Sequence, residues 1–240
     1  PTEFTASGKP KVDEDVLQGL DYPQAQTLVE YLLINKRIGQ LATGQNAWLK
    51  LCRNGRIHGQ VITNGAATGR CTHNRPNIAQ VPRAGAPYGE ECRALFHAPK
   101  GYRLVGADLS GLELRCLAHY MAKFDDGAYA KEVVEGDVHT ANQKAAGLPS
   151  RNNAKTFIYG FLYGAGPAKI GAIVGGTEAE GRKLINKFLK STPALKKLRE
   201  AVSNAVKKNG HLKGIDGRVL PIRSEHAALN TLLQSAGAVL

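Results

Sequence analysis

The segment from Arg151 to Gly164, RNNAKTFIYGFLYG, constrains the fold more than any other stretch of this 240-residue chain. On a helix, steps of four residues drift by only about 40° around the axis. Arg151, Lys155 and Tyr159 therefore lie in one row, with Tyr163 at its edge, and apolar residues fill the other directions. The segment predicts a helix that packs on a core and turns two cations and two phenol rings toward a cleft.

Such a row suits a nucleoside triphosphate, because cations bind phosphates and flat rings one or two turns further along contact the sugar and base. The same periodicity also fits an amphipathic helix with ordinary surface charges, so the row alone leaves both interpretations open. The chain carries a formal net charge of +12. That charge favours a polyanionic partner such as nucleic acid, with a basic surface that binds nothing as the alternative.

A candidate metal-binding carboxylate follows a short apolar run. Residues 102–107, YRLVGA, predict a buried strand that ends at Asp108, just before a helical pattern that begins near Leu112. Mg²⁺ commonly binds one or two carboxylates together with substrate phosphates, and Glu113 is close enough to share such a cleft. The alternative is that Asp108 caps the following helix.

A loop stiffened by proline carries a third set of polar residues. The stretch 68–82, TGRCTHNRPNIAQVP, presents Arg70, Asn77 and Gln80, whose side chains can donate to minor-groove acceptors of any base pair. Turn formation explains Asn77 equally well.

The remaining pattern predicts an α+β fold with a small antiparallel sheet and a mainly helical second half. Asn54-Gly55 lies between the strand-like runs WLKLCR and RIHGQVI, which is a hairpin signal. Thr177-x-x-Glu180 is a capping box, and a further helix is expected from Thr192-Pro193 to Gly210.

The four cysteines form no Cys-x-x-Cys pair, which disfavours a zinc site, and no apolar run approaches the roughly 18 residues of a membrane span. We therefore expect no membrane partner.

Four blocks of this sequence, in order, resemble those of family A DNA polymerases, closest to the replicative enzymes of short-tailed bacteriophages. DLSGLELR at 108–115 resembles motif A, and RNNAKTFIYGFLYG at 151–164 resembles the motif B helix. TGRCTHNRPNIAQVP at 68–82 and ALNTLLQSAGA at 228–238 resemble two further blocks.

The resemblance implies a role for each matching position. Asp108 and the Leu109 carbonyl match the metal ligands of motif A, and Glu113 matches the gate that excludes a ribose 2′-hydroxyl. The positions that match nucleotide-binding residues are His139, Arg151, Lys155 and the sugar-sensing Tyr159. The positions that match contacts to primer-template DNA are Arg70, Asn77, Gln80, Tyr163 and Gln234.

The implied reaction is attack of a primer 3′-hydroxyl on the α-phosphate of a dNTP, with two Mg²⁺ ions in the complete enzyme. The implied partners are primer-template DNA, dNTP and a processivity factor bound through a thumb region. The implied domains are the end of the thumb (1–45), the palm with motif A (46–120), the fingers with motif B (121–225) and the return into the palm (226–240). The implied location is the cytoplasm of an infected bacterial host.

One block of the family does not occur in these residues. Motif C, a His-Asp-Glu turn that carries the second metal-binding aspartate, is absent before Leu240. We therefore expect the chain to be part of a longer polymerase and to be inactive by itself. The alternatives are a non-catalytic nucleic-acid-binding module and a relative of single-subunit RNA polymerases, and Glu113 with Tyr159 disfavours the latter.

Overall fold

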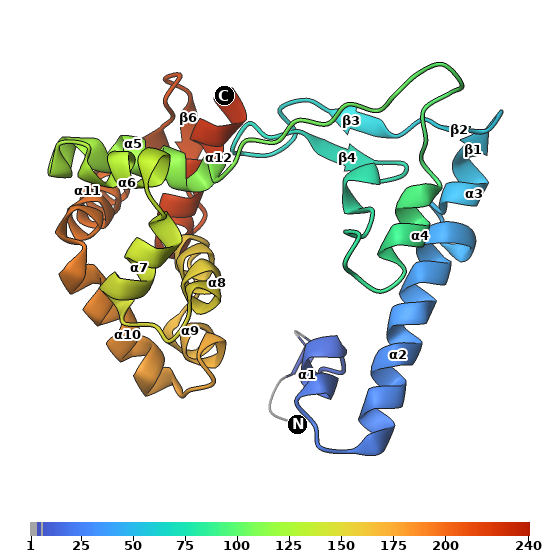
Figure 1. The fold of residues 1–240 in the computed structure, drawn as a ribbon, viewed down its shortest axis with the longest axis horizontal. Coiled ribbons are helices and arrows are strands. Elements are labelled where there is room, and N and C mark those ends of the chain that lie inside the picture. Colours follow the sequence, from blue (N-terminus) through green and yellow to red (C-terminus); the bar gives the residue numbers. More distant parts are fainter. Residues whose placement is uncertain (1–3, 6) are drawn as a thin grey trace. The chain divides into compact units, whose positions relative to one another are not determined.

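The computed structural model describes residues 4, 5 and 7–240 (Figure 1). The chain divides into two compact units, each of which is described by itself. Unit 1 comprises residues 1–62 and 73–101, and unit 2 comprises residues 63–72 and 102–240. These units do not coincide with the boundaries that the resemblance implies, so the assignment to thumb, palm and fingers stays a prediction.

Unit 1 is built around one long helix and several short elements. Its helices are α1 (Glu14–Gln18), α2 (Pro23–Ile38), the π-helical turn η1 (Gly39–Thr43), α3 (Trp48–Leu51), the 3₁₀ turn η2 (Ile78–Gln80) and α4 (Gly89–Ala94). Its strands are β1 (Cys52–Arg53), β2 (Arg56–Ile57) and β3 (Gln60–Ile62), and β3 pairs with β4 (Thr72–Asn74), which begins at the boundary with unit 2. Trp48 is buried and meets the ring of Phe96 edge-on at 5.0 Å between centroids.

The predicted hairpin is confirmed at its turn, but neither predicted strand has the expected length. The run RIHGQVI divides into β2, which pairs with β1, and β3, which pairs with β4. Antiparallel β1 and β2 flank Asn54 and Gly55, which both have positive φ, as this type of tight turn requires. Trp48–Leu51 is helical, however, with Trp48 buried and Leu49 exposed. Four residues are too few to distinguish a period of 2 from one of 3.6, so packing decides.

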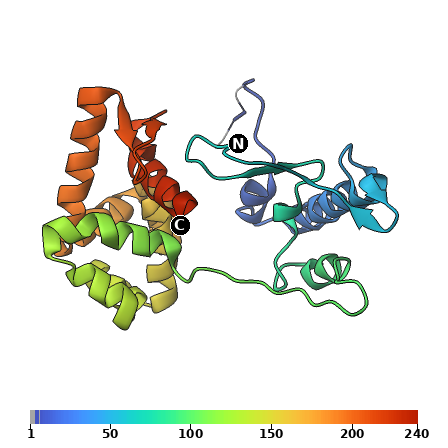
Figure 2. The same ribbon diagram turned by 90° about the horizontal axis from the view of Figure 1, so that it is seen from above.

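Unit 2 is a helical assembly with one small antiparallel hairpin (Figures 1 and 2). Its helices are α5 (Leu112–Asp125), α6 (Ala128–Glu135), α7 (Val138–Ala146), α8 (Arg151–Leu162), α9 (Pro167–Ile173), α10 (Glu178–Ser191), α11 (Pro193–Asn209), η3 (Glu225–Ala227) and α12 (Ala228–Val239). The hairpin pairs β5 (His211–Lys213) with β6 (Val219–Pro221). The α+β fold class is confirmed.

The helices of unit 2 begin and end where local signals place them. Thr177 and Glu180 form the reciprocal capping box of α10. Pro193 occupies the first turn of α11, and Gly210 ends it with φ of 72°. The predicted N-cap of α11, Thr192, makes no side-chain cap, because its hydroxyl donates to the carbonyl of Phe188.

The core of unit 2 surrounds α8. Phe157 is fully buried, and its ring meets Phe188 of α10 edge-on at 5.0 Å between centroids. Phe161 packs on both rings, at 5.9 Å from Phe157 and 5.7 Å from Phe188. The buried face fixes the rotation of α8 and so determines where its polar residues point.

The buried strand predicted for residues 102–107 is wrong. This segment has no regular structure, and Tyr102, Leu104 and Val105 are exposed at 76%, 74% and 93%. An apolar run becomes a buried strand only when neighbouring strands pair with it, and no described strand pairs with these residues. No helix within the described ranges is long and apolar enough to cross a membrane.

Candidate nucleotide and nucleic-acid site

Four polar side chains of α8 form the expected row, which we call the α8 row: Arg151, Lys155, Tyr159 and Tyr163. The first two are exposed and Tyr159 is half-buried. The rings of Tyr159 and Tyr163 lie 6.3 Å apart, so the row continues past the last residue of the helix. The periodicity therefore predicted the row correctly.

Arg151, at the cationic end of the α8 row, is held by a residue that the sequence did not reveal as part of the site. Asp137, the N-cap of α7, accepts two bonds from Arg151: Nε to Oδ2 at 2.8 Å and Nη2 to Oδ1 at 3.0 Å. This fork, aided by the hydroxyl of Thr140, holds the pKa of Asp137 well below its usual range. A ligand anion at Arg151 has to compete with Asp137. The signal that could have revealed Asp137 in the sequence is an aspartate directly before a helical pattern.

His139 of α7 joins the α8 row from the side. Its ring lies 6.2 Å from that of Tyr159, and its Nδ1 is buried without a partner in the described structure. Burial, followed by the positive charges of Arg151 and Lys155, lowers the pKa of His139. The imidazole is therefore mainly neutral at pH 7 and retains capacity for one more hydrogen bond.

The other end of the α8 row meets Glu113 of α5 and the loop that carries Arg70. The hydroxyl of Tyr163 donates to Oε1 of Glu113 over a long 3.5 Å. Burial, followed by the charge of Glu113, raises the pKa of both Tyr159 and Tyr163. The positive charge of Arg70 acts on the pKa of Tyr163 in the opposite direction, so Arg70 lies within electrostatic range of this ring. The four residues of the α8 row, His139 and Glu113 thus gather around one helix face, and the predicted Arg70 acts on the same group.

No described contact joins Asp108 to this group. Asp108 and Leu109 lie in the exposed irregular segment before α5, and Asp108 makes no hydrogen bond or ion pair with a described residue. Asp108 does not cap α5 either, because Gly111 occupies the N-cap position. No cluster of three or more His, Cys, Asp or Glu residues suited to a metal occurs in the described part of the chain.

The remaining predicted DNA contacts are divided between the two units. Asn77 and Gln80 belong to unit 1, where they line a cavity of about 660 Å³ with the cationic residues Lys36, Arg37 and Arg75. Oδ1 of Asn77 is buried there without a partner among residues 4, 5 and 7–240, so its side chain does not stabilise a turn. Gln234 is half-buried on α12 in unit 2.

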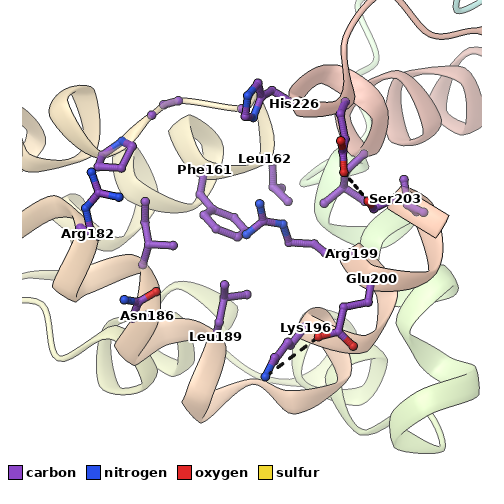
Figure 3. Close-up of a pocket in the computed structure, with 18 of the residues that line it drawn as sticks. Phe161, Leu162, Arg182, Asn186, Leu189, Lys196, Arg199, Glu200, Ser203 and His226 are labelled. Atoms are coloured by element: carbon purple, nitrogen blue, oxygen red, sulfur yellow. Dashed lines mark hydrogen bonds and ion pairs between the residues drawn. The ribbon is translucent and has the colours of Figure 1, made fainter. Parts of the chain in front are cut away.

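A cavity of about 840 Å³ lies between the end of α8 and helices α10 and α11 (Figure 3). Arg199 points into it, with the guanidinium carbon 5.0 Å from the centroid of the Phe161 ring, and burial lowers the pKa of Arg199. No residue of the α8 row lines this cavity. It is therefore distinct from the group around Tyr159.

Comparison with known proteins now gives the family. The model of DNA polymerase family A matches residues 1–240. The chain belongs to DNA polymerase family A. This family A chain is 51% identical over 269 aligned residues to the DNA-directed DNA polymerases of Enterobacteria phage T3 and of Escherichia phage T7. In each case the match covers 100% of the chain and 38% of the relative, so the chain spans about two fifths of their length.

A solved structure shows the same fold. The POL domain of Pol1 from M. smegmatis, in complex with DNA primer-template and dNTP, matches the family A chain with a TM-score of 0.80 at 23% identity. The match covers 99% of this chain and 45% of that one. The fold of a polymerase POL domain, which the resemblance implies, is thereby confirmed.

Proposed function

We propose that this chain supplies the nucleotide-binding helix and one metal-binding carboxylate for template-directed DNA synthesis by a longer phage-type polymerase. The primer 3′-hydroxyl attacks the α-phosphate of a dNTP, the new phosphodiester bond forms, and pyrophosphate leaves. The observation that carries the proposal is the convergence of the α8 row, His139 and Glu113 on one face of unit 2. The family match to DNA-directed DNA polymerases supports the same reaction.

The α8 row supplies charge at one end and rings at the other. Lys155 is exposed and makes no ion pair with any described residue, so its ammonium is available to a triphosphate. Near a protein surface, one cation and one phosphate charge 4 Å apart attract by about 4 kcal/mol before desolvation is subtracted. Neutral His139 adds a hydrogen bond to a phosphate oxygen.

The ring end of the α8 row suits the sugar and the base. Tyr159 lies between His139 and Tyr163, which matches a contact to the deoxyribose one turn from the phosphates. Glu113 lies beside the rings, where its carboxylate would disfavour a ribose 2′-hydroxyl. Tyr163, on which the charge of Arg70 acts, would contact the templating nucleotide.

Mg²⁺ suits the donors at the start of α5. The exposed carboxylate of Asp108 and the adjacent carbonyl of Leu109 are the hard oxygen ligands that Mg²⁺ prefers, and substrate phosphates complete its shell. Bound there, Mg²⁺ would stabilise negative charge on the reacting phosphate. Asp108 would hold the ion, and the α8 row would orient the triphosphate. We also propose that the longer polymerase binds a processivity factor through its thumb region.

The test is Asp108→Asn in the full-length polymerase that contains this chain. We expect the rate of primer extension to fall by at least about 100-fold, the scale of losing one preorganised charge contact, with an unchanged Kd for primer-template DNA. Asp126→Asn is the matched control, because Asp126 is also exposed and lies at the other end of α5. Undiminished primer extension by the Asp108→Asn variant would contradict the proposal. Absence of primer extension in both the wild type and this variant would favour a non-catalytic binding module.

The isolated 240-residue chain gives a second test. We expect it to bind primer-template DNA without extending the primer, since only one metal-binding carboxylate is present in the motif A context. Template-directed extension at the rate of the full-length polymerase would contradict this expectation.

A further inference from the structure

Arg218, at the turn between β5 and β6, reaches a segment far away in the sequence. Its Nη1 donates to Oδ1 of Asn64 at 2.9 Å, across 154 residues of chain. Its Nε donates to Oδ2 of Asp216 at 2.7 Å, and this bond lowers the pKa of Asp216. The guanidinium is thus fixed on one side by its own hairpin and binds segment 63–72 on the other.

The backbone of segment 63–72 closes directly over this guanidinium. A Cβ at Gly69 would lie 1.9 Å from Nη1 of Arg218, and Gly69 has φ of +85°. The segment turns here because the amide of Gly69 donates to the carbonyl of Ala66 at 2.8 Å, and Ala66 donates to that of Arg70 at 3.1 Å. The positive φ favours glycine at this position, and any side chain here would displace the Arg218 guanidinium.

The residue after Gly69 is Arg70, which acts on the α8 row. Burial and the charge of Glu113 raise the pKa of Tyr163, and the positive charge of Arg70 opposes that rise. The hydroxyl of Tyr163 contacts Glu113. Arg70 itself is exposed and hydrogen-bonds through its backbone only, among the described contacts. Its side chain therefore depends on the position of segment 63–72, and that position depends on Arg218.

We propose that Arg218 is a positioning residue for the polymerase reaction. It holds segment 63–72 against the β5–β6 hairpin so that Arg70 stays beside Tyr163 at the ring end of the α8 row. This inference rests on the proposed function, because it assigns Arg70 a contact with the template or primer. Arg218 acts on DNA through Arg70 and not by touching DNA itself.

A double-mutant cycle in the full-length polymerase tests the inference. We expect Arg70→Ala and Arg218→Ala each to raise the Kd for primer-template DNA about 10-fold, the scale of one hydrogen bond to a charged group. The double variant should be no weaker than Arg70→Ala alone, since both remove the same contact. The inference would be overturned if the Kd increase of the double variant equalled the product of the two single increases. An unchanged Kd in Arg218→Ala would also overturn it.

Two further variants separate positioning from folding. Asn64→Gly removes the acceptor of the Arg218 bond and tolerates the φ of 58° at this position, so it should reproduce the higher Kd without loss of the fold. Arg223→Ala removes an exposed arginine just after β6 and serves as the charge-matched control, with the Kd of the wild type. An effect of Arg223→Ala equal to that of Arg218→Ala would show a general charge effect and overturn the proposal.

Hydrogen exchange provides a readout that does not depend on activity. In the 240-residue chain, Arg218→Ala should speed amide exchange in residues 66–70, while exchange in α8 stays as in the wild type. Unchanged exchange in residues 66–70 would refute the positioning role. Failure of the proposed function would instead appear as full activity of Asp108→Asn, so the two failures are distinguishable.

Discussion

The buried hydrogen bond between Tyr129 of α6 and Asn142 of α7 offers a quantitative test of how unit 2 is held together. Nδ2 of Asn142 donates to the Tyr129 hydroxyl at 3.2 Å, and that hydroxyl lies 3.5 Å from Oδ1 of the same side chain. Asn142 is 1% exposed, and these are its only side-chain hydrogen bonds among the described residues. Burial raises the pKa of Tyr129 to about 12, so the hydroxyl stays protonated at neutral pH.

Tyr129→Phe removes the hydroxyl and leaves the carboxamide of Asn142 buried without a partner. Such an unsatisfied group costs about 1–3 kcal/mol of unfolding free energy. In a domain of this size, 1 kcal/mol corresponds to a Tm shift of about 2–4 °C. We therefore expect the Tm of unit 2 to fall by about 4–8 °C for a cost near the middle of that range.

Two optical probes can report the two units separately. Helices α5–α12 lie in unit 2, so far-UV circular dichroism follows mainly that unit, whereas the single Trp48 is buried in unit 1. Tyr129→Phe should lower the thermal midpoint seen by circular dichroism and leave the transition of Trp48 fluorescence unchanged. A shift of both transitions together would mean that the cost is not local to unit 2.

Replacing both partners is the matched control. In Tyr129→Phe with Asn142→Leu, no polar group is left unpaired, so the unfolding free energy should return to within about 1 kcal/mol of the wild-type value. If the single variant loses less than about 0.5 kcal/mol, or the double variant is less stable than the single one, the reasoning about this bond is refuted.

Other parts of unit 2 give three further predictions. Phe188→Ala should destabilise unit 2 by about 3–5 kcal/mol in denaturant titration, because the ring is buried against Phe157; a loss below about 1 kcal/mol would contradict this packing. Because Arg151 lowers the pKa of Asp137, the ion pair contributes stability above the unfolded pKa near 3.8 and loses it as pH falls through the lower folded value. The Tm difference between wild type and Asp137→Asn should thus be present at pH 6 and vanish in strong acid, and a pH-independent difference would argue against the pair. Tyr159→Phe in the full-length polymerase should weaken dideoxynucleotide incorporation relative to dNTP, and unchanged discrimination would mean that the phenol does not contact the sugar.

Local sequence signals predicted the helical half of the chain well. The capping box at Thr177, the proline at 193 and the apolar periodicity of 151–164 act within one or two turns, so they are readable without the fold. Segment 102–107 was misjudged because burial as a strand requires a pairing partner, and no described strand pairs with it. Strand formation requires partners, and a single sequence window does not contain them.

The candidate site divides in the same way. The α8 row follows from a helical period, and its members were found by spacing alone. Asp137 was missed as a site residue because its contact with Arg151 joins α7 to α8 and depends on the tertiary fold. The bond from Arg218 to Asn64 spans 154 residues and has no local signal at all, so only the fold could show it.

The pairing of Arg151 with Asp137 suggests how the phosphate end of the α8 row is kept ready. Both side chains are about half exposed, at 52% and 45%, so water and salt screen the pair and an incoming anion can displace it. Until then, the two-pronged contact fixes the long Arg151 side chain in one direction, which reduces the entropy lost when it binds a phosphate. Lys155 lies one turn away without such a partner in the described structure, so it can meet the triphosphate first. We expect Asp137→Asn to strengthen binding of pyrophosphate to the 240-residue chain, because removing the competing negative charge outweighs the lost orientation of Arg151. Weaker binding would contradict this balance.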